Sequence, residues 1–357
     1  METVEMNARD IIVIGTSSGG LEALKELVAQ LPPDFPATIF VVRHIGETIE
    51  TVLPQILEQS GHLTASLAAE SEYFKRGHIY CAPSRHHMVI EDDRLRLTKG
   101  PKENRFRPAV DPLFRSAALA LGTRVVGVIL TGSLDDGTAG LAAIKHCGGI
   151  AIVQDPREAR FPSMPQSALR NVHVDYCLPL REIAPLLVNL ANDPVSSFFE
   201  HSVDENLVIE NRIAFGDFAA LASIDQLGDL SRFTCPACHG AMREIQQANP
   251  ARFRCSTGHA YTAASLLADQ NVNLEDILSN TLRALEENVA LAEYLREYER
   301  EMCLPHEGTV LDLEAEKYRA HLIQMLLLHL NGPFSEASSP TLIENVPAEL
   351  TEFVAAT

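Results

Sequence analysis

Short runs of aliphatic and β-branched residues alternate with amphipathic stretches through the first half of the chain. Continuous apolar runs such as 125–131 (VVGVILT) indicate strands that are covered on both faces of a sheet. Apolar residues spaced three and four apart after the first run indicate a helix, which ends before Pro32–Pro33. The predicted strands are Asp10–Gly15, Thr38–Arg43, Ile79–Ala82, Val125–Thr131 and Ile150–Gln154, and the helical face holds Leu21, Leu24, Leu27, Val28 and Leu31.

This alternation predicts an α/β fold over residues 1–195, a doubly wound and mainly parallel sheet with flanking helices. Residues 88–97 differ, because two alternating runs around Asp92–Asp93 predict an antiparallel hairpin. In open parallel sheets, functional side chains gather beyond the carboxyl ends of the strands. The ends of the predicted strands are therefore the places to look for chemistry.

The second half of the chain has a different pattern. A capping pattern of Asn273 followed by Asp276 predicts the start of a helix that runs to about Met302, with leucines at four-and-three spacing. A second helix is predicted to start at Thr309–Asp312 and to end at Asn331–Pro333. The predicted segments are the α/β domain 1–195, an acidic linker 196–232 with a short strand, a zinc-ribbon-like Cys/His module 233–270, an α-helical hairpin 271–332 and a tail 333–357.

Composition places the chain among folded proteins of two or three domains. It has 357 residues, of which 46% are hydrophobic and 22% are charged. Its apolar stretches stop short of the about 18 residues that a membrane-spanning helix needs, so no membrane insertion is expected. The acidic N-terminus lacks the basic start of a signal peptide, and seven scattered cysteines do not suggest a disulfide framework. These features predict a cytoplasmic protein.

Acidic charge is concentrated in the second half. The net charge is −19, of which residues 1–195 contribute −4 and residues 196–357 contribute −15. Nucleic-acid binding requires basic surface to contact phosphates, so this class of partner is not expected.

A glycine-rich turn, Gly15-Thr16-Ser17-Ser18-Gly19-Gly20, follows the first predicted strand. It does not fit a dinucleotide fingerprint, because Ser17 occupies the middle glycine position and no acidic residue follows about 20 residues later. It also lacks the lysine of a P-loop. Two interpretations remain: a G-x-S-x-G turn that exposes a nucleophilic serine, or a tight turn in which the serine only caps the helix.

Two further strand ends carry residues that would complete such a site. His44 follows the second strand, and Asp135–Asp136 follow the strand at 125–131. Each has an ordinary structural interpretation, as a packed histidine or as helix-capping aspartates. Together with Ser17 they offer a nucleophile, a base and an orienting carboxylate. Their order, Ser, His, Asp, differs from that of α/β-hydrolases.

Further motifs occur in order along the first half of the chain. They are 14–20 with Glu22-Ala23, 43–45, 80–83 followed by His86-His87-Met88, 107–116, 130–132 with Asp135-Asp136-Gly137 and Gly140, Gln154-Asp155 and Met164-Pro165. Through these motifs residues 10–195 resemble the catalytic domain of CheB-type protein-glutamate methylesterases. The resemblance implies that Ser17 is the nucleophile, His44 the general base and Asp136 the aspartate that orients it. It also makes the backbone N–H groups of Ser18 and Ser133 candidate oxyanion donors.

One further residue matches the family, and two features of the sequence depart from its pattern. His87 corresponds to a histidine near the family's active-site cleft. Ser133-Leu134 stands where the family usually has Met-Gly, which changes one side of the expected oxyanion hole. The catalytic strand begins at residue 10, so the receiver domain that usually precedes it is not expected.

The function implied by the resemblance is hydrolysis of glutamate methyl esters, and deamidation of glutamines, on the cytoplasmic helices of methylated chemoreceptors. A CheR-type methyltransferase would be the counterpart in the pathway, and catalysis would need no cofactor. Two alternatives remain: a catalytically impaired signalling adaptor, and a serine hydrolase of small esters or amides. Residues 1–195 are expected to act without the remainder of the chain, and the acidic second half to hinder approach to acidic receptors.

Cysteine and histidine spacing in the second half predicts a metal site. Cys235 and Cys238 are followed by Cys255 and His259, two paired clusters with the spacing of a zinc ribbon. Four protein ligands leave no open position, so the predicted Zn²⁺ is structural. His239 is an alternative ligand, and a metal-free cluster or a redox Cys-x-x-Cys are alternatives to zinc.

Overall fold

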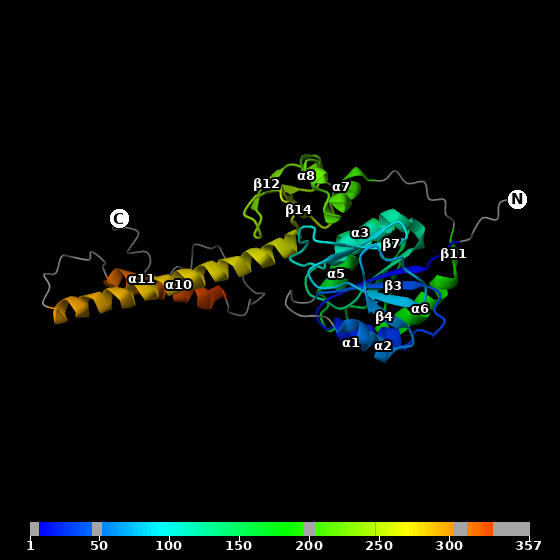
Figure 1. Ribbon diagram of the computed structural model, residues 1–357, viewed down its shortest axis with the longest axis horizontal. Coiled ribbons are helices and arrows are strands. Elements are labelled where there is room, and N and C mark those ends of the chain that lie inside the picture. The colour runs from blue at the N-terminus through cyan, green and yellow to red at the C-terminus, as the bar shows by residue number, and fades with distance from the viewer. Residues whose placement is uncertain (1–6, 45–51, 196–203, 247, 303–312, 331–357) are drawn as a thin grey trace. The chain divides into compact units, whose positions relative to one another are not determined.

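The computed structural model describes residues 7–44, 52–195, 204–246, 248–302 and 313–330 (Figure 1). The chain divides into two compact units, Met1–Gln270 and Asn271–Thr357. The first unit takes in the α/β domain, the acidic segment and the Cys/His module. No helix among the described residues has the length and apolar character needed to span a bilayer.

A seven-stranded parallel sheet forms the centre of the first unit. Its strands lie in the order β10-β9-β8-β2-β3-β5-β4, and every pairing is parallel. The five predicted strands are confirmed, whereas β4 and β10 were not predicted because they are short and partly exposed. The bounds are β2 (Ile11–Thr16), β3 (Thr38–Arg43), β4 (Thr64–Leu67), β5 (His78–Cys81), β8 (Val125–Ile129), β9 (Ile150–Gln154) and β10 (Tyr176–Leu178).

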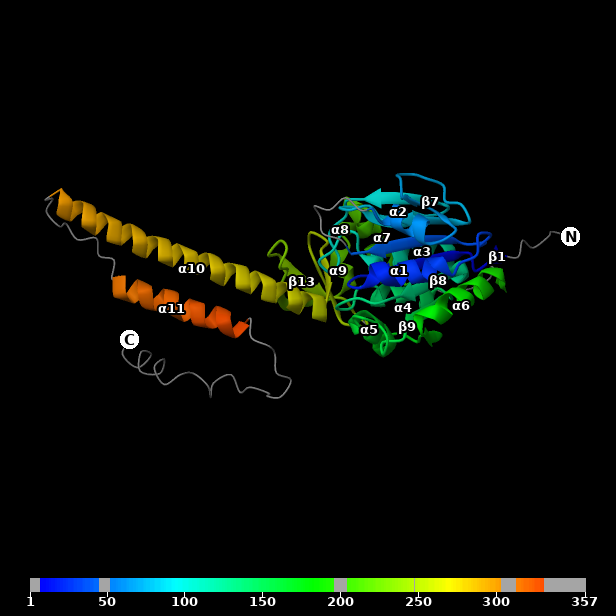
Figure 2. The ribbon, with the colours of Figure 1, turned by 90° about the horizontal axis from the view of Figure 1, so that it is seen from below.

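Helices cover both faces of this sheet (Figures 1 and 2). On one face, Ile12 and Ile14 of β2 pack against α1 (Gly20–Ala29), α2 (Leu53–Ser60) and α6 (Leu180–Asn192). On the other, Ile11 and Val13 pack against α3 (Val110–Leu121), α4 (Thr138–His146) and α5 (Ser163–Asn171). Alternate residues of one strand thus enter different cores, which explains its continuous apolar run. The doubly wound fold is confirmed.

The chain changes direction at β2, because β3 lies on one side of it and β8 on the other. Such a switch point opens a crevice at the carboxyl ends of the strands. Thr16, Arg43 and Ile129 end the three neighbouring strands there. The residues that follow them are therefore placed side by side, although they are far apart in the sequence.

Smaller elements complete the α/β part. The predicted hairpin forms from β6 (His87–Glu91) and β7 (Arg94–Thr98), with Asp92 at a φ of 53° in its turn. Its apolar side packs on α3. A 3-10 turn, η1 (Gly122–Arg124), precedes β8, and β1 (Asn7–Ala8) pairs with β11 (Pro194–Val195).

The acidic segment, predicted as a linker with a short strand, is helical between residues 205 and 227, and the next strand begins at Leu230. Its helices are α7 (Glu205–Ala214), α8 (Phe218–Leu221) and α9 (Ile224–Leu227). Asp204 and Asp217 cap the first two by accepting backbone N–H bonds, so part of the acidic character has a structural use. The buried side chains of these helices form a small core of their own with Ile245.

The Cys/His module is a four-stranded antiparallel sheet. Its strands are β12 (Leu230–Thr234), β13 (Ala241–Glu244), β14 (Arg252–Cys255) and β15 (Ala260–Thr262), in that order. Its core includes Met242, Phe253 and Tyr261 beside the cysteines.

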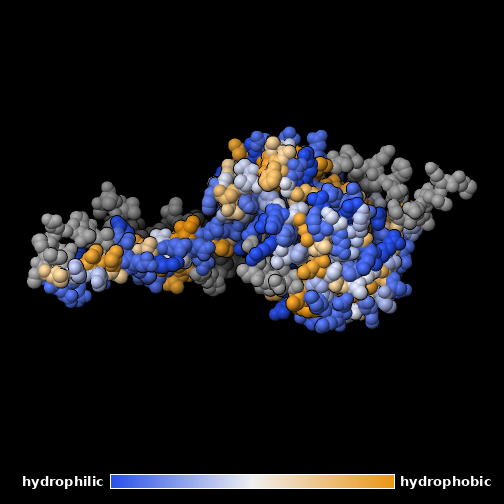
Figure 3. All heavy atoms as spheres, viewed as in Figure 1, coloured by the Kyte–Doolittle hydropathy of each residue, from blue (hydrophilic) through white to orange (hydrophobic). Residues whose placement is uncertain are grey.

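Two helices follow the module. The first, α10 (Ala263–Glu301), starts ten residues before the predicted capping pattern at Asn273. The second, α11 (Leu313–Leu330), begins directly after Asp312, which together with Thr309 and the tail lies outside the described residues. In the second unit α11 runs back along α10, with Lys317 paired to Glu293, so the helical hairpin is confirmed (Figure 2). Exposed apolar side chains line these helices (Figure 3).

Candidate active site and metal centre

Ser17 sits in the sharp turn between β2 and α1. Its backbone N–H donates to the Thr131 carbonyl at 3.1 Å, which ties the turn to the end of β8. Gly19 follows with a φ of 75°, in the left-handed region that glycine tolerates best. Gly132 faces the turn, and a Cβ there would lie 3.0 Å from the Ser17 Cβ. These constraints fix a half-buried hydroxyl at the carboxyl edge of the sheet.

His44 lies between the side chains of Ser17 and Asp136. Its Nδ1 is 3.2 Å from the Ser17 Oγ, and its Nε2 is 2.7 Å from the Asp136 Oδ2. The ring stacks on Phe106, with centroids 3.9 Å apart and planes 9° from parallel. A carboxylate at Nε2 holds the proton on that nitrogen, which leaves Nδ1 able to accept the hydroxyl proton.

Asp136 is buried and its carboxylate is held by five donors. Oδ2 accepts from His44 and from the Val110 N–H, and Oδ1 accepts from the Gly137 N–H, the Asp111 N–H and the Asn104 side chain. Burial alone would raise the pKa of Asp136, but the hydrogen bonds, first that from His44, hold the pKa below its usual value. The group therefore stays ionised and fixed in orientation.

The candidate oxyanion residues come from two turns that meet beside Ser17. The Ser133 Oγ donates to the Ser18 Oγ at 3.3 Å, so the two turns are adjacent. Leu134 adopts a φ of 63°. The leucine thus takes the left-handed conformation that glycine would adopt more readily.

His87 makes no described hydrogen bond with Ser17, His44 or Asp136. Its side chain is fully buried, its Nε2 is 2.9 Å from the Pro101 carbonyl, and its Nδ1 accepts the Ala109 N–H at 3.3 Å. Burial lowers the pKa of His87 to about 4, so the ring is neutral. These two hydrogen bonds hold the His87 ring against both ends of the segment 101–109.

Asp135 points away from His44 and toward the Cys/His module. Its Oδ1 accepts a 2.7 Å hydrogen bond from the Thr262 hydroxyl, the last residue of β15. Only 6% of Asp135 is exposed, and burial raises its pKa to about 6 although the bond from Thr262 opposes this shift. The two adjacent aspartates therefore have different partners.

This raised pKa predicts a pH-dependent effect of Asp135→Asn on stability. In the unfolded chain the carboxyl loses its proton near pH 3.8, whereas the folded protein keeps it to about pH 6. Above pH 3.8 the unfolded state therefore binds fewer protons, and the free energy of unfolding falls as the pH rises to about 6. Urea unfolding should show the variant gaining up to about 3 kcal/mol relative to wild type between pH 3.5 and pH 7. Parallel pH profiles of the two proteins would contradict this.

Sequence reasoning missed the loop 102–107, which contributes Asn104 and Phe106 to the site. Asn104 is 3% exposed, and its side-chain amide donates to both Asp136 and Asp111 at 2.9 Å. Burial and the nearby Asp136 raise the pKa of Asp111 to about 7. The only signal was position, because both residues lie within three positions of the motif that starts at Arg107.

A buried ion network lies behind this loop and was also not predicted. Glu103 accepts from Arg115 of α3 at 2.7 Å and from Arg254 of β14 at 3.0 Å. Glu210 of α7 accepts from Arg252 at 2.6 Å and from Arg254 at 2.8 Å. Paired arginines hold the pKa values of both glutamates well below the usual value, against the effect of burial. The α/β domain, the acidic segment and the module thus share one buried network.

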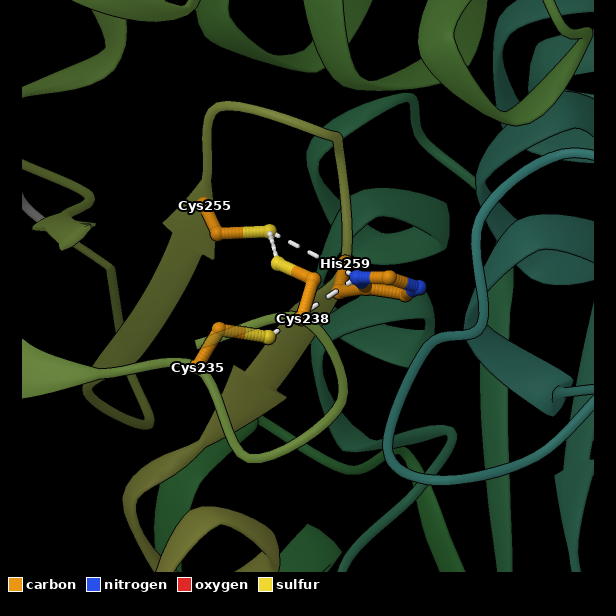
Figure 4. A group of neighbouring side chains, drawn as sticks. All are labelled: Cys235, Cys238, Cys255 and His259. Atoms are coloured by element: carbon orange, nitrogen blue, oxygen red, sulfur yellow. Dashed lines mark hydrogen bonds between the residues drawn. The ribbon is translucent and has the colours of Figure 1, made fainter. Parts of the chain in front are cut away.

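The four predicted metal ligands converge. Sγ atoms of Cys235, Cys238 and Cys255 and Nδ1 of His259 all lie within 4.8 Å of one another (Figure 4). The Cys238–Cys255 sulfur distance is 3.6 Å, and His259 Nδ1 is 3.7 Å from Cys235 and 3.6 Å from Cys255. Tetrahedral zinc gives ligand separations of about 3.5–3.8 Å. The cluster can hold a metal ion and is compatible with zinc; His239 does not belong to it.

The first half of the chain is similar in sequence to known proteins. A family model described as CheB methylesterase matches residues 12–187. A Leptospira interrogans relative, provisionally named protein-glutamate methylesterase/protein-glutamine glutaminase, is 40% identical over 182 residues, 51% of this chain and 94% of its own length. A relative with that activity in its name, from Anaeromyxobacter dehalogenans, is 39% identical over 181 residues, 51% of this chain and 53% of its own.

A solved structure is also similar to part of this chain. The Thermotoga maritima CheB methylesterase catalytic domain is 34% identical, with a TM-score of 0.49 over 51% of this chain and 98% of that one. The family model matches residues 12–187, and the Leptospira interrogans relative is matched over 94% of its length. The chain therefore belongs to the CheB methylesterase family of carboxylic-ester hydrolases.

Proposed function

We propose that this chain hydrolyses glutamate methyl esters on the cytoplasmic helices of chemoreceptors, with Ser17 as nucleophile, His44 as general base and Asp136 as its orienting carboxylate. The observation that carries the proposal is the His44 ring, 3.2 Å from the Ser17 Oγ and 2.7 Å from Asp136. The names of the relatives support glutamate methyl esters of proteins as the substrate class.

The reaction would proceed as two acyl transfers. The Ser17 Oγ attacks the ester carbonyl carbon while its proton passes to His44 Nδ1, and the tetrahedral oxyanion is stabilised by backbone N–H groups at Ser18 and Ser133. His44 then donates the proton to the leaving methoxide, which releases methanol. Water, activated by the same ring, attacks the acyl-enzyme and releases the glutamate carboxylate. Deamidation of glutamine follows the same steps with ammonia as the leaving group.

The geometry around the departure from the family pattern supports a competent site. Leu134 takes a φ of 63°, and Ser133 lies against Ser18. The impaired-adaptor alternative relied on this pair of substitutions. Methanol release separates the hydrolase from the adaptor.

Methanol release tests the substrate class directly. The full chain is incubated with a receptor cytoplasmic fragment methylated by a CheR-type methyltransferase carrying a labelled methyl donor, and volatile label is counted. In a second reaction the chain is incubated with unmethylated fragment and simple methyl esters, and methanol release is measured in the same way. Turnover of the receptor fragment far above that of the simple esters supports the proposal. Turnover of the simple esters alone identifies a small-ester hydrolase, and no turnover at all supports the adaptor.

We further propose that Cys235, Cys238, Cys255 and His259 hold one structural zinc ion. Four protein ligands would fill a tetrahedral coordination sphere, so the ion would stabilise the module and take no part in the acyl transfers. The ligand separations support zinc over a redox pair, because all four atoms and not two are brought together.

Elemental analysis should find about one zinc ion per chain in protein purified under reducing conditions with zinc supplied. Cys235→Ser should lose most of the metal, because it removes one thiolate from the cluster. Cys177→Ser is the matched control, since Cys177 is an exposed cysteine of β10 outside the cluster. Equal metal content in the two variants would argue against the site.

A further inference from the structure

The loop 102–107 lies between the catalytic side chains and the Cys/His module. On the catalytic side, Phe106 stacks on His44 and Asn104 donates to Asp136. Glu103 anchors the loop to Arg115 of α3. The loop is thus in direct contact with two members of the proposed triad.

The amide of Asn104 uses all four of its hydrogen-bonding positions. Both N–H groups go to carboxylates, those of Asp111 and Asp136. Its Oδ1 accepts the Thr262 N–H at 3.0 Å and the Ser265 hydroxyl at 3.0 Å. The Thr262 N–H can only donate, so the atom of the Asn104 amide that faces it must be the oxygen. The NH₂ group therefore faces the two carboxylates. Residues of the module therefore orient the side chain that contacts Asp136.

The module also holds the backbone of the loop. The Asn104 N–H donates to the Ala260 carbonyl at 2.8 Å, and the Ala260 N–H donates to the Lys102 carbonyl at 3.2 Å, so the loop pairs with β15. Arg254 of β14 binds Glu103, and Arg105 pairs with Asp269 of α10 at 2.9 Å. Nearly every residue from 102 to 105 has a partner in the module.

The candidate metal ligands are adjacent to these contacts. Cys255 and His259 bound the short turn that joins β14 to β15, and within it the Gly258 N–H bonds to the Cys255 carbonyl at 2.8 Å. Arg254 directly precedes Cys255, and Ala260 directly follows His259. Closing this turn on a metal ion would therefore fix the two residues that hold the loop.

We propose that the Cys/His module is a working part of the hydrolase active site: it holds the loop 102–107 and, through Asn104 as a positioning residue, orients the Asp136 carboxylate on His44. The proposal rests on the triad function proposed above. Metal binding at the module would then set the activity of a site in the other half of the chain. Residues 1–195 without the module would keep the triad but lose the partners of the loop, so the contacts argue against a fully active fragment.

Metal loss supplies the first test, made on the full chain. Cys238→Ser removes a ligand that makes no described contact with the loop, and Cys177→Ser is the control. Zinc content, hydrogen exchange of the peptide 100–108 and methanol release are measured on both. We expect Cys238→Ser to lose zinc, to exchange faster at 100–108 than wild type, and to fall about 10- to 100-fold in kcat. The strands β2 and β8 should exchange as in wild type.

Asn104→Gly supplies the second test and leaves the metal ligands intact. Glycine tolerates the φ of 48° at this position, so the backbone is preserved while the amide is lost. Asp92→Gly is the control, because Asp92 has a φ of 53° in the remote hairpin turn. We expect Asn104→Gly to keep its zinc and its KM and to lose about 10- to 100-fold in kcat, with Asp92→Gly unchanged.

The outcomes separate the two proposals. Zinc loss in Cys238→Ser with unchanged exchange at 100–108 overturns the coupling, and so does Asn104→Gly with wild-type kcat. Should Cys238→Ser unfold as a whole, Asn104→Gly decides, because its metal site is untouched. If wild type releases no methanol, the proposed function fails, while the exchange measurement still decides whether the module holds the loop.

Discussion

Ser17→Ala is expected to reduce methyl-ester hydrolysis by about 10⁴- to 10⁶-fold, to the level left by binding and oxyanion stabilisation alone. The hydroxyl that His44 faces at 3.2 Å is removed, and no acyl-enzyme can form. Stability should hardly change, because the Ser17 side chain is half-buried and its turn is held by the backbone bond to Thr131. Single-turnover methanol release measures the loss.

Ser18→Ala is the matched control for this variant. Ser18 is the adjacent serine of the same turn, and its proposed contribution is a backbone N–H that alanine retains. It should keep most of the turnover, and a serine-directed fluorophosphonate probe should label Ser18→Ala but not Ser17→Ala. Activity retained in Ser17→Ala and lost in Ser18→Ala would reassign the nucleophile.

Asp136→Asn is expected to lower kcat by about 10⁴-fold. Both carboxylate oxygens accept hydrogen bonds, so an amide NH₂ group at either position would face donors. With the NH₂ group toward His44, the ring must accept at Nε2 and carry its proton on Nδ1, where it faces the Ser17 hydroxyl and cannot act as a base. The negative charge that stabilises the protonated ring is lost as well. The rate over pH 6–9 measures the effect.

Asp135→Asn is the control, one residue away in the same turn. An asparagine Oδ1 still accepts the Thr262 hydroxyl, and Asp135 makes no described contact with His44. This variant should keep most of its turnover. Equal losses at the two positions would show that the effect comes from the turn and not from the orienting carboxylate.

Much of the α/β fold and the candidate triad could be predicted from the sequence. A parallel sheet covered on both faces leaves a strong signal, since its central strands are continuous apolar runs such as VVGVILT. Ser17, His44 and Asp136 each follow such a strand, and parallel topology brings neighbouring carboxyl ends to one edge. The Cys/His cluster was predictable for a similar reason, because its ligand spacing is a local property of the chain.

The acidic segment shows where local reasoning failed. Residues 204–227 carry weak apolar periodicity, and the aspartates that give them a linker-like composition are helix caps. The small core that these helices form also includes Ile245 of the module, which is distant in the sequence. Helix α10 likewise starts at a cap formed by Thr262 and Ser265, which bond each other and Asn104.

By itself the sequence determined the five central strands of the sheet, the order of the three strand-end residues and the metal-ligand spacing, because each is encoded within a few neighbouring positions. The family resemblance already favoured Asp136 over Asp135 as the partner of His44. Only the tertiary structure decided that Phe106 and Asn104 complete the site, and that residues 102–105 pair with residues 254–269. Those contacts join segments about 150 residues apart in the chain. Hydrogen bonds and buried ion pairs of this kind carry no periodic signal along the sequence, because one polar residue on each side is enough to make them.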